Sequence, residues 1–191
     1  MQRIPPENKP IAARTSKTSY NDQHSYRWGR SMIIDEVYEN LYVSGIIAVQ
    51  AQDVVYVEGV RAVVRLDSAF RQRGHWDDRF TVLDLPMMDG ELIPDGYIEQ
   101  VTRFIKEQHD ADKPVLVHCA MGMSRSVSMA MAYLIEYEGM SLPESFQTVR
   151  EGRVVAHPHE QMLRSLVEHY DLPYGMDEIN GTQFLSRLAS E

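Results

Sequence analysis

One segment of ten residues gathers side chains whose types and spacing suit covalent chemistry. Residues 117–126 read Val-His-Cys-Ala-Met-Gly-Met-Ser-Arg-Ser, so five residues separate Cys119 from Arg125, and Ser126 follows directly. A cysteine thiolate is a strong nucleophile, and an arginine guanidinium can hold two phosphate oxygens at once. The pattern therefore predicts that Cys119 attacks a phosphorus atom whose oxygens Arg125 holds.

The position of this segment favours an ionised thiol. Residues 118–124 lie between the apolar run Val115–Val117 and a second apolar stretch, residues 125–138, as a loop between a buried strand and a helix would. Backbone N–H groups at a helix N-terminus favour a thiolate and also bind phosphate. The pKa of a free thiol is near ~8.5, and sites of this kind lower it to roughly 3.5–7.5. Gly122 allows backbone angles that other residues resist in a tight loop.

The other residues of the segment have distinct expected roles. Ser126 can donate its hydroxyl to the cysteine sulfur, which would help the sulfur to leave in a second, hydrolytic step. His118 is expected to support the loop through hydrogen bonds rather than to act as an acid or base. Arg125 would also stabilise charge on a transferring phosphoryl group. The residues predicted to bind the substrate phosphate are Ala120, Met121, Gly122, Met123, Ser124 and Arg125.

The surrounding pattern of apolar residues predicts alternating strands and helices. Short apolar runs bounded by turn residues indicate strands at 40–43, 61–66, 80–85 and 115–117. Helical spacing or flanking signals indicate helices at 49–58, 95–108, 125–138, 141–151 and 159–170. The order favours an α/β domain with a central, mostly parallel sheet flanked by helices. The helix at 125–138 is apolar on nearly every face and should be buried.

The length of 191 residues predicts one domain with tails. Residues 1–30 are polar and contain three prolines, so we expect a flexible N-terminal segment. Residues 31–171 form the predicted catalytic domain, and 172–191 a C-terminal tail.

The charge is unevenly distributed along the chain. The net charge is −9, yet residues 1–30 carry six basic and two acidic residues, which leaves −13 for the rest. An acidic body argues against nucleic-acid binding, which needs a basic face. The basic segment could contact an acidic partner or a membrane surface, although a solvated tail is the simpler interpretation.

Cysteine usage and hydropathy limit the class of protein further. The single cysteine excludes an intrachain disulfide and a thiolate zinc site. No run of 18 apolar residues and no apolar signal-peptide core is present, so no membrane span is expected. We therefore expect a cytoplasmic protein that uses no metal or cofactor, and the oligomeric state stays open.

The chain resembles a known family at the cysteine segment and beyond it. His118-Cys119, five residues, then Arg125-Ser126 is similar to the signature of the protein-tyrosine phosphatase superfamily, and the fuller string resembles its dual-specificity branch. The resemblance spans roughly residues 35–170 and includes the following further segments: Leu41–Gly45, Ala132–Leu134, Met140–Leu142, Arg153 and Pro158. It implies the cysteine-phosphatase fold, metal-free catalysis, a phosphocysteine intermediate and phosphoprotein substrates. Residues 1–30 and 172–191 lie outside it.

The resemblance also implies an aspartate on an upstream loop, which protonates the leaving oxygen. Asp84, Asp89 and Glu91 compete for this role. Asp84 lies inside an expected strand, whereas Asp89 lies just after it, beside Gly90 and 30 residues before Cys119, as in the family. We therefore predict Asp89 as the general acid. A general acid typically raises the reaction rate by ~10²–10⁴-fold. A bell-shaped pH profile should follow, because Asp89 must be protonated while Cys119 is ionised.

The same segment is compatible with other functions. A lone cysteine is most often a small buried hydrophobe, but the ordered set of residues at a strand-to-helix junction argues against that interpretation. A phosphatase of the same fold could act on a phosphoinositide, an RNA 5′-triphosphate or a small phosphoester, yet Ala120, Met121 and Met123 carry no charge for a polyanion. A phospho-binding module is not supported, since Cys119 and Arg125 are both present. A rhodanese-type sulfurtransferase fits the Arg-Ser ending less well.

Overall fold

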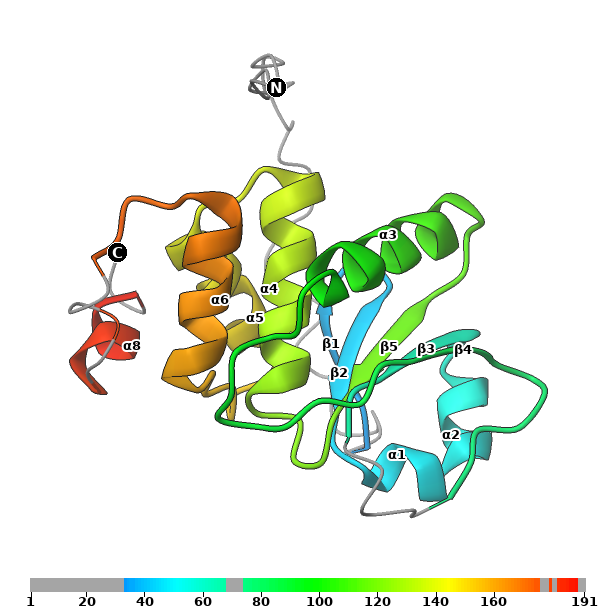
Figure 1. Ribbon diagram of the computed structural model, residues 1–191. Coiled ribbons are helices and arrows are strands. Elements are labelled where there is room, and N and C mark those ends of the chain that lie inside the picture. Colours follow the sequence, from blue (N-terminus) through cyan, green and yellow to red (C-terminus); the bar gives the residue numbers. More distant parts are fainter. Residues whose placement is uncertain (1–32, 68–73, 176–178, 180–181, 189–191) are drawn as a thin grey trace, which may run out of the picture. The chain divides into compact units, whose positions relative to one another are not determined.

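The computed structural model describes residues 33–67, 74–175, 179 and 182–188. The predicted flexible segment 1–30 lies outside these ranges. Figure 1 shows the strands and helices, whose bounds are β1 Asp35–Tyr38, β2 Leu41–Ser44, α1 Ile47–Gln50, α2 Gln52–Val57, β3 Ala62–Arg65, β4 Thr81–Asp84, α3 Tyr97–Asp110, β5 Val115–His118, α4 Arg125–Glu138, α5 Leu142–Gly152, α6 Glu160–Tyr170 and α8 Thr182–Leu188.

The strands form one five-stranded sheet in the order β1-β2-β5-β3-β4. Strands β2, β5, β3 and β4 are parallel, and β1 adds an antiparallel edge to β2. This confirms the predicted mostly parallel α/β sheet. Because His118 at the end of β5 is in register with Ser44 and Arg65, the loops after three strands meet at one edge of the sheet. Ligands of open parallel sheets bind at this edge.

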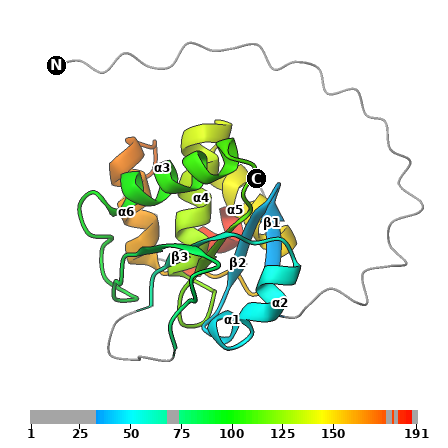
Figure 2. The ribbon, with the colours of Figure 1, turned by 90° about the vertical axis from the view of Figure 1, so that its right-hand side faces the viewer.

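The two faces of the sheet bury different helices (Figures 1 and 2). Along β5, Val115 and Val117 belong to the larger core, which contains residues of α3, α4, α5 and α6. Leu116 points to a smaller core with Val55 of α2 and Phe80. The alternation follows from the two-residue period of a strand. Both faces of β5 are therefore covered, and all four of its residues are buried.

Helix α4 has the predicted bounds, and its first ten residues are buried. Helix α5 begins with a capping box, in which the Ser141 hydroxyl accepts from the Glu144 amide and the Glu144 carboxylate accepts from the Ser141 amide. None of the helices within the described ranges is long and apolar enough to cross a lipid bilayer.

Two elements differ from the prediction. Strand β1 was not predicted, because its sequence Asp-Glu-Val-Tyr buries only Val37 at the sheet edge and shows almost no apolar pattern. The single helix predicted at 49–58 was wrong: α1 begins at Ile47 and the helix breaks at Ala51 (φ −120°, ψ 38°) before α2. At the break the Gln52 side chain donates to the Val49 carbonyl (3.0 Å), a carbonyl that a continuous helix would use for its backbone.

Residues beyond position 171 contribute to the larger core. The side chains of Ile179, Phe184 and Leu188 are at most 2% exposed, and α8 packs on α5. This packing was not anticipated from the sequence, in which the segment 172–191 was predicted to be a tail.

Candidate active site

The loop between β5 and α4 holds Cys119 with two groups directed at its sulfur. Cys119 is 1% exposed. The Gly122 amide donates a hydrogen bond to Cys119 Sγ (3.2 Å), and the Ser126 hydroxyl lies 3.3 Å from the same atom. Both groups can donate to a sulfur that carries negative charge. Ser126 is the second residue of α4, so the N-terminal turn of the helix also faces the sulfur.

Gly122 is required by the shape of this loop. Its φ is +68°, a left-handed conformation that L side chains rarely adopt. A Cβ atom at this position would lie 2.4 Å from the carbonyl carbon of Ser44. The loop therefore packs directly against the end of β2, and the Ile46 amide donates to the Ala120 carbonyl at 3.0 Å.

Arg125 is buried and anchored at one end of its guanidinium. Its Nη1 donates to the carbonyls of Leu66 (3.2 Å) and Met87 (2.9 Å), which follow β3 and β4. Its buried Nε makes no hydrogen bond with any described residue and lies 3.9 Å from Asp89 Oδ2. The anchored nitrogen fixes the plane of the group, and the Nε edge remains for the oxygens of a ligand.

The carboxylate of Asp89 lies beside the loop. Its Oδ1 accepts a hydrogen bond from the Ser124 hydroxyl at 2.7 Å. The same hydroxyl oxygen accepts from the amide of His159, just before α6, at 3.0 Å. The Asp89 side chain is 44% exposed, so it remains open to an incoming substrate.

The competing carboxylates lie differently. Asp84 is on β4 and pairs with Arg65 at 3.7 Å, and Glu91 is exposed. Of the three predicted candidates, Asp89 is therefore the one that is hydrogen-bonded to the cysteine loop. Its assignment as the acid remains a prediction, which this position supports.

His118 is fully buried and held by an indole. Trp76 Nε1 donates to His118 Nε2 (3.0 Å), so the hydrogen of the neutral ring is on Nδ1, 3.8 Å from Asp67 Oδ1. Burial lowers the pKa of His118 to about 4, although the neighbouring Asp67 opposes this shift. A neutral ring near pH 7 agrees with the predicted structural role. Trp76 lies in a polar loop, where no sequence motif marks it.

Arg153 supports the loop from outside. Its Nη2 donates to the Met121 carbonyl (3.1 Å), its Nε donates to the Gly122 carbonyl, and its Nη1 pairs with the carboxylate of Asp35 on β1. The Arg153 guanidinium therefore binds the carbonyls of Met121 and Gly122, while the Gly122 amide faces the sulfur. The resemblance had marked Arg153 by position only, and nothing in the sequence marked Asp35.

The structure thus gathers Cys119, Ser124, Arg125, Ser126 and Asp89, which the sequence had predicted to act together. The backbone N–H groups of residues 120–125 remain predicted phosphate ligands.

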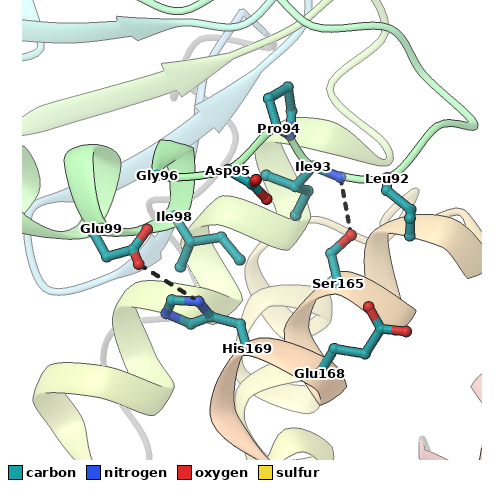
Figure 3. A pocket seen from close by; sticks show the side chains of 10 residues that line it. All are labelled: Leu92, Ile93, Pro94, Asp95, Gly96, Ile98, Glu99, Ser165, Glu168 and His169. Atoms are coloured by element: carbon teal, nitrogen blue, oxygen red, sulfur yellow. Dashed lines mark hydrogen bonds and ion pairs between the residues drawn. The ribbon is translucent and has the colours of Figure 1, made fainter.

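Among the described residues, one cavity adjoins the cysteine loop and a larger one does not. One of about 410 Å³, between the segment before α3 and helix α6, is lined by Asp95, Glu99 and Glu168 (Figure 3). It contains none of the predicted site residues, and its carboxylates would repel a phosphate. The other cavity, of about 350 Å³, includes Asp89 and Ser124 and so adjoins the cysteine loop.

Comparisons with known proteins agree with this geometry. Residues 41–172 match the family model "Dual specificity phosphatase, catalytic domain". The chain is 32% identical over 129 residues to dual specificity protein phosphatase 1 of Arabidopsis thaliana, covering 67% of this chain and 64% of that one. It is 27% identical over 111 residues to dual specificity protein phosphatase 2 of Mus musculus, covering 58% and 34%.

Solved structures extend the likeness to the fold. The active form of Tk-PTP superposes with a TM-score of 0.67 at 26% identity, covering 75% of this chain and 98% of that one. The matched region spans less than two thirds of the length of the two relatives above. The family model nevertheless covers most of the chain and includes the whole cysteine loop. The chain therefore belongs to the dual specificity phosphatase family.

Proposed function

We propose that the protein is a cysteine-dependent protein phosphatase that hydrolyses phosphotyrosine, and phosphoserine or phosphothreonine as well, through a phosphocysteine intermediate. The observation that carries the proposal is the arrangement around Cys119 Sγ, which has hydrogen-bond donors at 3.2 and 3.3 Å. Arg125, six residues further on, has a buried Nε that hydrogen-bonds to none of the described residues. The names of the related proteins support a protein substrate.

In the first proposed step, the Cys119 thiolate attacks phosphorus and the bond from phosphorus to the substrate oxygen breaks. Arg125 and the loop amides hold the non-bridging oxygens and stabilise their charge. The proton of the Asp89 carboxyl passes to the leaving oxygen. The products of this step are the dephosphorylated side chain and phosphocysteine.

In the second proposed step, the Asp89 carboxylate takes a proton from water. The water oxygen attacks phosphorus, the bond from phosphorus to sulfur breaks, and inorganic phosphate leaves. The Ser126 hydroxyl, 3.3 Å from Sγ, donates to the departing sulfur and so stabilises it as a thiolate.

Hydrolysis of p-nitrophenyl phosphate in the presence of EDTA tests the proposal. We expect turnover by the wild type, none by Cys119→Ser, and a loss of at least about 100-fold in Arg125→Lys, because lysine lacks the bidentate fork. Ser128→Ala on α4 serves as a folding control. Turnover by Cys119→Ser equal to that of the wild type would overturn the mechanism.

The substrate class needs a separate test. Phosphotyrosine, phosphoserine and phosphothreonine peptides, compared with phosphoinositides at equal concentration, should show higher kcat/KM for peptides. A clear preference for a phosphoinositide would reassign the substrate. Since the reaction needs a reduced thiol, we also propose a cytoplasmic location, where thiols are kept reduced.

A further inference from the structure

An apolar groove adjoins the proposed reaction site. One wall consists of residues at or beside the cysteine loop: Asp89, Met121, Met123 and Ser124. The lining also includes Leu163 of α6 and, as a C-terminal wall, Ile179 and Leu185. The volume is about 350 Å³, within the range of small ligand pockets. Because Asp89 belongs both to the groove and to the reaction site, the groove lies next to the place where a substrate would bind.

The groove has a fixed base and an adaptable rim. Leu163 and Ile179 are each 1% exposed, so packing holds them in place. Met121 is 66% exposed and Leu185 is half-buried, so both can contact an incoming group. Methionine adapts readily to different apolar shapes. The groove therefore suits an apolar group better than a hydrated one.

The C-terminal wall lies outside the region that matches the family model, which ends at residue 172. Helix α8 is held by Phe184 and Leu188, which are buried in the larger core. Leu185, between them, lies at the groove. This wall is thus supplied by a part of the chain that lies outside the match.

We propose that the groove binds an aliphatic or aromatic side chain of the substrate peptide next to the phosphorylated residue, with Leu185 as a specificity-determining residue. The inference rests on the proposed phosphatase function. A peptide side chain is favoured because the groove is continuous with the reaction site, where a neighbouring residue of the substrate must lie. The Glu160 carboxylate at the groove disfavours an acidic side chain there, and His157 and His159 also line the groove.

The test uses phosphotyrosine peptides with alanine at all flanking positions, in which leucine or glutamate is placed at each position from −3 to +3 in turn. At one or two positions, leucine should raise kcat/KM over alanine by about tenfold, and glutamate should lower it. Equal values for all peptides would overturn the inference. p-Nitrophenyl phosphate serves as the reference: its turnover with a flat peptide profile rejects only the groove, whereas no turnover rejects the proposed function.

Variants of α8 make the test specific. The readout is the ratio of kcat/KM for the leucine and alanine peptides, which does not depend on the fraction of folded protein. Leu185→Asn should bring this ratio close to one, and Leu185→Lys should shift the preference to glutamate at the same position. Ser186→Ala, on the same helix, should keep the wild-type ratio.

A wild-type ratio in both Leu185 variants would overturn the proposal. The proposal would also be overturned if the specific activity of the wild type decreased as the protein concentration rose and a dimer formed. The groove would then be filled by a second copy of the chain.

Discussion

The side chain of Asp89 shows how one residue acquires its setting from two distant segments. Ser124 donates to its carboxylate from the cysteine loop, and His159 fixes Ser124 from the start of α6. The carboxylate therefore has a defined position near Arg125 while still reaching solvent. An acid that serves both reaction steps needs both properties.

Replacing Asp89 should affect substrates according to their leaving group. In Asp89→Asn we expect kcat on phosphoserine peptides to fall by ~10²–10⁴-fold, because the departing alkoxide lacks a proton donor. The fall should be smaller for p-nitrophenyl phosphate, whose leaving group is stable as an anion. Glu91→Gln and Asp84→Asn are the matched controls. A large loss in either control, with none in Asp89→Asn, would move the acid to that residue.

Buried His118 should make the folded state sensitive to acid. Its pKa is about 4 in the folded protein and about 6.5 in the unfolded chain, so the unfolded state binds more protons between these values. The free energy of unfolding should therefore fall as pH drops from about 6.5 to about 4, by at most about 3 kcal/mol. The charged and polar neighbours are Asp67, Arg65 and Trp76.

Urea unfolding at pH 7 and pH 5 checks this prediction. Between pH 7 and pH 5 the free energy of unfolding should decrease less in His118→Gln than in the wild type, because the variant lacks the titrating imidazole. The other titrating groups are common to both proteins. Parallel decreases in the two proteins would show that His118 does not contribute.

At the scale of elements, the cysteine loop is fixed from three sides. Ser44 at the end of β2 and Ile46 before α1 contact it, Arg153 holds two of its carbonyls, and α4 follows it directly. This support explains how the amide of Gly122 is held facing the sulfur. A loop of this kind is preorganised for charge that develops during reaction.

Gly122 and Gly139 have the same φ of +68°, so comparing alanine variants at the two positions distinguishes backbone strain from steric crowding. At Gly139, the C-cap of α4, an added Cβ meets nothing within 4 Å, so Gly139→Ala should cost only about 1 kcal/mol of stability. At Gly122 the Cβ would lie 2.4 Å from Ser44 and 2.6 Å from Arg153, so the loop must move. We expect kcat/KM of Gly122→Ala to fall by about 100-fold or more.

Steady-state kinetics and urea unfolding of both variants check this expectation. Equal activity of Gly122→Ala and Gly139→Ala would mean that the loop can relax without loss of its function.

At the scale of the whole molecule, the described part of the C-terminal segment belongs to the hydrophobic core. Phe184 stacks edge-on against Tyr174 at 5.6 Å between ring centroids and is 2% exposed. The segment should therefore unfold together with the body of residues 31–171.

Phe184→Ala should lower the free energy of unfolding by about 3–5 kcal/mol, because it leaves a cavity in the core. Val57→Ala, at a side chain of α2 that is 82% exposed, should change it by no more than about 0.5 kcal/mol. Urea unfolding followed by circular dichroism measures both. An unchanged value for Phe184→Ala would mean that α8 detaches before the body unfolds.

The site could be predicted from the sequence as far as its signals are local. The spacing from Cys119 to Ser126 lies within one strand-loop-helix unit, and the position of Asp89 follows from the strand before it. The carbonyls that hold Arg125 belong to Leu66 and Met87, 59 and 38 residues away in the chain. Trp76 and Asp35 also reach the site across such distances, and single residues of this kind leave no periodic pattern.

The amino-acid sequence by itself predicts Cys119 as the nucleophile. It also determined the parallel α/β architecture and most of the element bounds, because apolar periodicity and turn residues act over a few positions. Tertiary structure alone decided how Arg125 is anchored, which carboxylate touches the loop, and that Ile179 and Leu185 form a wall beside it. The break at Ala51 and the edge strand β1 were likewise decided by tertiary structure. These features depend on contacts between segments far apart in the chain, which only the packing of the core brings together.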